Sequence, residues 1–196
     1  GAGDRIIQFV EATAIPQAMV SMLQALPNTA LWHRLKREER LLEEDKEANI
    51  HQGTLINFVP TRPVEDLARE YVSCFWELYE PHRYLGRVHR HFLQMQPTPH
   101  KRKFKIPDWM TLRALLIIMW RQGVKRYTRF QFWRQLFSIL RKNPRIFERY
   151  IVNCAHLEHF LEYRQIVRNN IEAQLAEYLA EKAKLSAEVR QTELVS

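Results

Sequence analysis

The C-terminal quarter of the sequence constrains the fold most, because it contains neither of the residues that usually end helices. No proline or glycine occurs after Pro144. Helical propensity is therefore uninterrupted over about fifty residues, which predicts one long helix or two shorter ones. The second half of this region carries an apolar stripe formed by Phe160, Val167, Ile171, Leu175 and Leu179. Such a stripe requires a partner surface, which another part of a larger protein could supply.

Composition favours a globular, helix-rich chain of one domain or a domain with an appendage. The 196 residues are 46% hydrophobic and 27% charged, which is enough to bury a core. Five glycines argue against a glycine-rich phosphate loop and a turn-dense β-sandwich. Cys74 and Cys154 are too few for a disulfide framework or a cysteine-only metal site. We expect them to be reduced, structural thiols in a cytoplasmic protein. Secretion is not predicted, because the sequence does not open with a charged segment followed by an apolar one.

Positive charge is concentrated in residues 83–149. This segment holds seventeen Lys and Arg residues against two acids, Asp108 and Glu148, so its formal charge is +15 and the rest of the chain sums to −7. Such a field attracts phosphates, anionic headgroups or acidic protein surfaces. One interpretation is a solvated face whose counter-charges lie on a partner domain. The others are an anionic membrane surface or lipid-like substrate and, least favoured, a nucleic acid.

The first forty residues follow a helix-strand-helix order. We expect residues 1–3, Gly-Ala-Gly, to be a cloning remnant and residues 4–13 to form an amphipathic helix. The short apolar run 18–26 fits a buried parallel strand. A turn follows, and Thr29 is placed to cap a helix that runs to about residue 39. This order is typical of an α/β barrel.

The remaining elements are predicted to be mainly helical. Residues 54–59 fit a short strand, and residues 42–51 and 94–107 fit a polar loop and a basic, proline-broken linker. Helices are predicted over 63–79, from Pro81, and over 108–122 with Gly123 at its C-cap. The apolar run in 108–122 favours a buried core helix over an interfacial segment, and it is too short to span a bilayer. Thr128 and Gln131 have the spacing of a capping box. The helix they begin is expected to bury Phe132, Trp133, Leu136, Phe137 and Leu140.

Two histidine clusters are the candidates for a binding site. His156 and His159 share a helical face at i,i+3, but Cys154 and Glu158 lie on another face. Two ligands make a weak site, so we expect a hydrogen-bonded or exposed pair without a metal. The second cluster, His82, His89 and His91 among Arg83, Arg87 and Arg90, fits an anion site or, more often, a solvated basic helix. No residue is assigned a catalytic role.

A string near the N-terminus resembles part of a known enzyme family. Residues 18–32 read AMVSMLQALPNTALW and are similar to the sixth strand and following turn of a radical SAM barrel. In that family the turn usually reads Leu-Pro-Gly-Thr-Pro-Leu. Asn28 replaces the glycine, and asparagine is the next best residue for a left-handed backbone position. Ala30 replaces the second proline, which loosens the turn without contradicting it.

Three further strings extend the resemblance over nearly the whole chain. REERL at 37–41 resembles the charged exit from the helix after that strand. GTLINFVP at 53–60 and YEPHRYL at 79–85 are similar to the opening of a domain of unassigned role that follows the barrel in cobalamin-binding radical SAM proteins. The resemblance thus assigns residues 4–42 to the end of the barrel and residues 43–196 to a helical accessory domain. The predicted fold class is mainly α, with a helix-strand-helix remnant of an α/β barrel in front.

The resemblance also implies a function. Members of this architecture methylate unactivated carbons, on hopanoid lipids or bacteriochlorophyll precursors for example, using a 4Fe-4S cluster, S-adenosylmethionine (SAM) and cobalamin. The chain is then expected to be an accessory domain that handles a hydrophobic substrate or caps the barrel. In the family the sixth strand ends beside the adenine of SAM, so Leu23, Gln24 and Ala25 are expected to form one edge of the cofactor pocket. An ordinary buried strand end is the alternative.

The departures from the family pattern are as informative as the match. The three cluster cysteines, spaced Cys-x3-Cys-x2-Cys, and the cobalamin-binding domain are absent. We therefore expect a piece of a larger enzyme that is inactive alone and binds no cofactor itself, with the missing barrel and cobalamin-binding domains as its partners.

Further expected partners are a hydrophobic small-molecule substrate, an anionic membrane surface and a second copy of the chain. The unpaired edge of the strand at 18–26 is expected to pair either with residues 54–59 or with that second copy. The alternative function is a helical module that binds a protein or membrane surface through residues 83–149. Membrane association would then accompany a cytoplasmic location.

Overall fold

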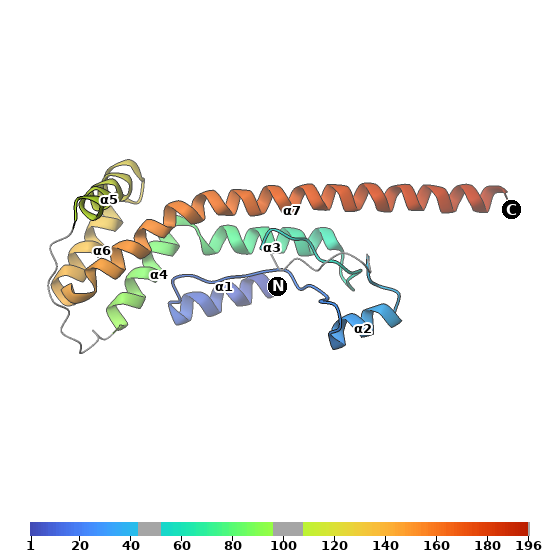
Figure 1. The fold of residues 1–196 in the computed structure, drawn as a ribbon, viewed down its shortest axis with the longest axis horizontal. Helices are drawn as coiled ribbons and strands as arrows, with labels where there is room; N and C mark the ends of the chain where they lie inside the picture. Colours follow the sequence, from blue (N-terminus) through green and yellow to red (C-terminus); the bar gives the residue numbers. More distant parts are fainter. Residues whose placement is uncertain (43–51, 96–107, 196) are drawn as a thin grey trace. The chain divides into compact units, whose positions relative to one another are not determined.

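The computed structural model describes residues 1–42, 52–95 and 108–195, and these are mainly helical, as predicted. Over this part of the chain no β-strand forms, and a single antiparallel bridge joins Leu41 to Phe58. The helical elements (Figure 1) are α1 (Ala2–Thr13), α2 (Ala30–Arg37), α3 (Val64–Leu78), α4 (Pro81–Gln94), α5 (Trp109–Trp120), the π-helical η1 (Arg121–Lys125), α6 (Arg129–Lys142), the 3-10 helix η2 (Pro144–Ile146) and α7 (Phe147–Val195).

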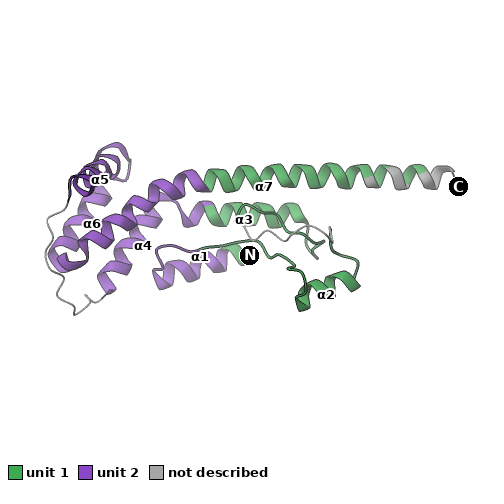
Figure 2. Cartoon of the chain, in the orientation of Figure 1, with its two compact units in different colours: residues 1–3, 19–75, 164–196 green, residues 4–18, 76–163 purple. Residues whose placement is uncertain are grey.

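The chain divides into two compact units that are interleaved along the sequence (Figure 2). The first comprises residues 1–3, 19–75 and 164–196, and the second comprises residues 4–18 and 76–163. The boundary predicted near residue 42 concerns a longer protein and stays a prediction. The polar loop at 43–51 and most of the linker at 94–107 lie outside the described residues.

Helix α7 is one continuous helix, which decides between the two arrangements that the sequence left open. Its apolar stripe is buried most deeply at Val167 and Ile171 in the first unit, each only 1% exposed. In the second unit the same helix buries Tyr150, Cys154 and Leu157. Burial of apolar side chains along one face stabilises such a helix, because helical propensity alone contributes little to its stability.

The turn before α2 forms as the sequence predicts. Thr29 Oγ1 accepts a hydrogen bond from the backbone N–H of Trp32 (3.2 Å) and caps the helix. Asn28 adopts φ 64°, the left-handed conformation for which asparagine is well suited. Residues 1–3 enter the fold, because α1 begins at Ala2 and Gly3 N–H donates to Glu70 Oε1 (2.8 Å).

The strands predicted at 18–26 and 54–59 are wrong. Residues 18–26 lie without a hydrogen-bonded ladder, and their exposure is uneven: Met19 is 91% exposed, whereas Met22 is buried. Residues 54–59 form only the bridge at Phe58, where Leu42 N–H donates to Asn57 O (3.1 Å) and Val59 N–H donates to Arg40 O (2.7 Å). Side chains supply the bonds that a neighbouring strand would otherwise give. Tyr71 Oη donates to Val20 O (2.9 Å), and Gln24 Nε2 donates to Leu55 O (2.7 Å). The predicted pairing of the two segments therefore takes place through side chains, without β-sheet structure.

The second unit packs aromatic and aliphatic side chains between α1, α4, α6 and the start of α7. Its arrangement corrects the predicted face of α6: Phe132 and Leu136 are buried, but Phe137 and Leu140 are exposed, and Ile139 is buried instead. The capping box is also wrong, because Thr128 makes no side-chain cap and Gln131 Nε2 donates to His82 O (3.0 Å). Gln131 thus bonds α4 and does not cap its own helix.

Helix α5 is not the buried core helix that its composition favours. None of its residues is buried, and Trp109 and Met110 are 73% and 77% exposed. An apolar run predicts only that a helix avoids water. Whether another element covers it depends on tertiary packing.

Gly123 has a different role from the predicted helix cap. It lies buried in η1 with a negative φ, and the Trp133 indole N–H donates to its carbonyl (2.9 Å). A Cβ atom at this position would lie 2.8 Å from the nearest atom of the Trp133 ring. Close approach to an indole, and not a left-handed backbone, is the reason glycine fits here.

Replacing Gly123 by alanine should therefore lower the free energy of unfolding by about 1–3 kcal/mol, as overpacking does. Gly86→Ala in α4 is the matched control, since its Cβ would meet no atom closer than 3.6 Å. The control should raise stability by about 0.5–1 kcal/mol through helical propensity. Urea unfolding followed by circular dichroism measures both, and equal effects at the two glycines would contradict the indole contact.

Candidate functional site

The three residues expected to border a cofactor lie at the end of the extended segment in the first unit. Leu23 is 62% exposed, Gln24 is half-buried and Ala25 is fully buried. Gln24 uses its amide N–H on Leu55 O, while its neighbour Leu23 presents an apolar side chain to solvent. The structure therefore brings the three residues into one short, fixed segment with different surroundings. Their contact with a cofactor stays a prediction.

Asn57 fixes this segment, and the sequence analysis did not single it out. Its Oδ1 accepts from the backbone N–H of Ala25 (2.8 Å), and its Nδ2 donates to Ala25 O (3.0 Å). A primary amide carries one donor group and one acceptor, so it replaces one residue of a neighbouring strand. The signal was present in the sequence, because Asn57 belongs to the Asn-Phe-Val-Pro part of the string at 53–60.

The string at 79–85 has a comparable structural role in the second unit. Tyr79 Oη donates to Ala18 O (2.7 Å) and accepts from Ala18 N–H (3.2 Å), and its ring stacks on Phe160 with centroids 4.0 Å apart. Glu80 caps α4 by accepting from Arg83 N–H (2.8 Å), and Pro81 begins the helix. The residues that carry the family resemblance are thus those that hold backbone segments in place.

Arg87 departs from the interpretation of α4 as a solvated basic helix, although His82, Arg83 and Arg90 on this helix are exposed. Its side chain is completely buried, and its guanidinium donates to Glu11 Oε1 (2.6 Å), Leu78 O (2.6 Å) and Ile15 O (3.1 Å). Arg90 donates to the other oxygen of Glu11 (2.6 Å). Because Glu11 already neutralises Arg87, this cluster offers no open anion site at that arginine.

His89 lies half-buried on the same helix. Burial lowers its pKa below the ordinary value of 6.5, and the positive charges of Lys142, Arg134 and Arg90 lower it further. The unfolded chain therefore keeps this proton to a higher pH than the folded chain does. Between the lowered pKa of the folded state and 6.5, the free energy of unfolding rises with pH.

As the pH falls below about 6.5, the free energy of unfolding of the wild-type chain should decrease more than that of His89→Gln. Urea unfolding of both proteins between neutral and mildly acidic pH gives this difference and cancels the groups that they share. A difference that stays constant with pH would contradict the lowered pKa.

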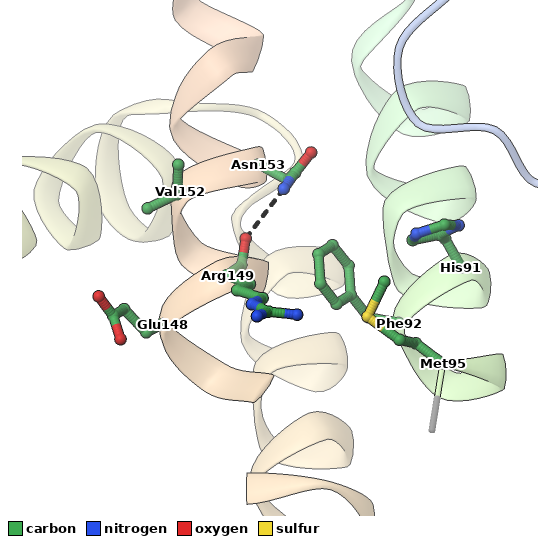
Figure 3. A pocket seen from close by; sticks show the side chains of 7 residues that line it. All are labelled: His91, Phe92, Met95, Glu148, Arg149, Val152 and Asn153. Carbon is green, nitrogen blue, oxygen red and sulfur yellow. Dashed lines mark hydrogen bonds between the residues drawn. The ribbon is translucent and has the colours of Figure 1, made fainter. Parts of the chain in front are cut away.

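A shallow hollow of about 330 Å³ opens between α4 and α7 in the second unit. Figure 3 shows Arg149 reaching toward α4, whereas Glu148 points away from it. Asn153 is held in place, since its Nδ2 donates to Arg149 O (3.0 Å) and its Oδ1 accepts from Gln17 (3.2 Å). The lining residues are His91, Phe92, Met95, Glu148, Arg149, Val152 and Asn153. The lining thus combines apolar side chains with an arginine, a histidine and a glutamate.

The histidine pair of α7 is hydrogen-bonded and stacked. Gln17 Nε2 lies 2.5 Å from His156 Nδ1, and the His159 ring stacks on Tyr163. Over the described ranges no three His, Cys, Asp or Glu residues are grouped as metal ligands. Cys154 is buried on a different face, and burial raises the pKa of its thiol to about 12, which makes it an inert structural thiol.

Glu158 anchors the π-helical turn to α7. Its carboxylate accepts two hydrogen bonds from Arg126 (2.9 and 2.7 Å) and one from Gln122 (2.8 Å). This paired geometry raises the pKa of Arg126. The end of α5 is therefore fixed to the second unit although α5 itself is exposed.

Comparison with known proteins identifies the family. The domain of unknown function DUF4070 matches residues 29–173, which include both strings at 53–60 and 79–85. The chain belongs to the DUF4070 family. No solved structure matches it significantly.

Two curated relatives of the DUF4070 chain carry names that refer to methyl transfer. It is 62% identical over 180 residues to "Uncharacterized methyltransferase sll1242" of Synechocystis sp. (strain ATCC 27184 / PCC 6803 / Kazusa), covering 92% of this chain and 33% of that protein. It is 29% identical over 138 residues to the hopanoid C-2 methylase of Rhodopseudomonas palustris (strain TIE-1), covering 67% of this chain and 25% of that protein. The chain thus spans a third or less of the length of either relative.

Proposed function

We propose that this DUF4070 chain is the C-terminal accessory domain of a cobalamin-dependent radical SAM methyltransferase that acts on a hydrophobic substrate. Its role there is to handle the substrate or to cap the barrel. The names of the two relatives support the methyl-transfer part of the proposal. The resemblance of residues 18–32 to the sixth barrel strand supports the radical SAM part.

The observation that carries the proposal is the tie between residues 18–26 and the string at 53–60. Asn57 binds both backbone polar groups of Ala25, so the segment that would border the cofactor is fixed by a residue of the accessory domain. In this structure the segment forms no β-ladder, and the side chains of Tyr71 and Asn57 bind its backbone. This is the arrangement expected of a barrel strand whose remaining neighbours belong to other parts of a longer protein.

The residues present fit one edge of an adenine pocket. Leu23 offers an exposed apolar side chain, which suits a flat base, and Gln24 is held beside it. Ala25 contributes by position, because it is buried and its backbone N–H and carbonyl are bound to Asn57. SAM, when bound, supplies the radical chemistry. In this proposal Leu23 and Gln24 orient one side of its adenine.

The iron–sulfur cluster and cobalamin would be bound elsewhere in the longer protein. Both cysteines of this chain are buried, and Cys74 points its thiol at Gly3 O (3.7 Å). Two buried thiols on separate helices do not fit a cluster that requires three closely spaced cysteine ligands. We therefore assign no methyl-transfer step to residues of this chain, and the chain alone should be inactive.

The test uses the longer protein, reconstituted anaerobically with iron and sulfide, with and without residues 43–196. Iron content, SAM cleavage and methylation of a hydrophobic substrate are measured. Loss of methylation with the cluster and SAM cleavage retained supports substrate handling, whereas loss of the cluster supports barrel capping. Full methylation without these residues would overturn the accessory role. A longer protein that binds no iron–sulfur cluster would overturn the radical SAM assignment.

A further inference from the structure

Helix α5 and η1 present an apolar surface that no described residue covers. The stripe Trp109, Arg113, Leu116 and Trp120 follows the i, i+4, i+7, i+11 spacing of one helical face, and every residue in it is exposed. An adjacent stripe of Met110, Ile117 and Val124 is exposed as well. We call these seven residues the α5 surface. Exposed apolar patches of this kind are uncommon on proteins that contact only water.

The α5 surface lies in a stretch of chain from which acidic residues are excluded. Nine Lys and Arg residues and no Asp or Glu occur between Trp109 and Phe147. Arg113, Lys125 and Arg129 are exposed, and no ion pair involves them within the described residues. Their charges are therefore available to an anionic partner, whereas Arg126 is already bound to Glu158.

Exposed apolar side chains beside exposed cations favour a lipid bilayer over a water-soluble partner. Trp side chains at both ends of an apolar helix, with arginine between them, match the interface between headgroups and acyl chains. The twelve residues of α5 are about 18 Å long, which is too short to cross a hydrocarbon core of about 30 Å. Among the helices described, none is long and apolar enough to span a membrane. Helix α5 would then lie in the plane of the interface.

We propose that the α5 surface docks on an anionic membrane, with Trp109, Leu116 and Trp120 entering the interface and Arg113, Lys125 and Arg129 binding acidic headgroups. The bonds from Gln122 and Arg126 to Glu158 hold this element against α7, so docking needs no rearrangement of the second unit. The proposal is independent of the methyltransferase assignment.

The experiment measures partition of the full chain onto vesicles by flotation in about 0.1 M salt. One set of vesicles is phosphatidylcholine with about one-third phosphatidylglycerol, and the other is phosphatidylcholine alone. Wild-type chain should float with the first set. Arg113→Glu/Lys125→Glu/Arg129→Glu should weaken partition by at least about a hundredfold, since each cation near an anionic surface contributes about fivefold.

Arg34→Glu/Lys36→Glu/Arg37→Glu in α2 is the matched control with the same change in net charge. It should alter partition by less than about threefold, because these cations belong to the first unit and are not part of the α5 surface. A second readout is quenching of tryptophan fluorescence by brominated lipid. Quenching should be strong in the wild-type chain and weak in Trp109→Ser/Trp120→Ser, with circular dichroism confirming that both are folded.

Four results would overturn the proposal: no flotation, equal partition onto neutral vesicles, an equal effect of the α2 control, or unchanged quenching in the tryptophan variant. Two further outcomes identify a different occupant. A dimer in analytical ultracentrifugation that the tryptophan substitutions dissociate would assign the surface to a second copy. A longer protein that fails to float while the chain does so would assign it to the rest of that protein.

Discussion

Arg87→Met is expected to lower the free energy of unfolding by about 3–5 kcal/mol, the largest effect predicted for any substitution in this protein. Arg87 is fully buried, and its guanidinium binds one carboxylate and two backbone carbonyls. Methionine fills much of the volume but leaves the carbonyls of Ile15 and Leu78 without their donors. A buried acceptor that loses its partner bears the full cost of desolvation.

Two variants separate the buried network from the charge alone. Arg87→Lys keeps the charge but lacks the planar fork that reaches three acceptors, so it should recover only part of the lost stability. Arg90→Met removes the neighbouring cation, which is 47% exposed and shares Glu11, and should cost less than about 1 kcal/mol. Urea unfolding monitored by circular dichroism measures all three. Similar losses for Arg87→Met and Arg90→Met would show that the buried contacts do not dominate.

Asn57→Leu is expected to be the second most damaging substitution, with a loss of about 2–4 kcal/mol. Leucine is close to asparagine in shape but provides neither the acceptor for Ala25 N–H nor the donor for Ala25 O. Ala25 is completely buried, so water cannot replace the missing bonds without opening the segment. Under the proposed function, the same change in the longer protein should weaken SAM binding, because Leu23 and Gln24 lose their support.

Asn57→Asp divides the two contributions, since aspartate can still accept from Ala25 N–H but presents an oxygen to the Ala25 carbonyl in place of a donor. Its stability should fall between wild type and Asn57→Leu. Asn169→Leu is the surface control: this exposed asparagine bonds only Gln165 on its own helix among the described residues, and its loss should change stability by about 0.5 kcal/mol or less. A stable Asn57→Leu chain would mean that residues 18–26 are held by other contacts.

Local signals in the sequence predicted most of the helices. Asn28 takes the left-handed conformation expected at the turn, Thr29 caps α2, and Pro81 begins α4. These features depend on contacts within a few residues, which the sequence specifies directly. The capping box at Thr128 failed for the converse reason, because Gln131 binds His82 of another helix. A distant contact that satisfies the same amide is not visible in a local spacing.

The candidate site was predicted in part. The strings at 53–60 and 79–85 were recognised as the specific part of the resemblance, but their structural roles appear only when Asn57 meets Ala25 and Tyr79 meets Ala18. Arg87 was interpreted as part of a solvated helix because an arginine among histidines and arginines is usually exposed. Its partner, Glu11, lies 76 residues away in the sequence. No helical periodicity encodes that pairing.

The sequence by itself determined the helical class, the lack of a proline or glycine after Pro144 and the concentration of positive charge in residues 83–149, since each depends on residue type and local spacing. Tertiary structure decided which of these features are buried. It exposed the apolar α5, buried the charged Arg87, and gave residues 18–26 side-chain partners in place of a neighbouring strand. A side chain is buried only where other parts of the chain pack against it, and those parts lie far away in the sequence.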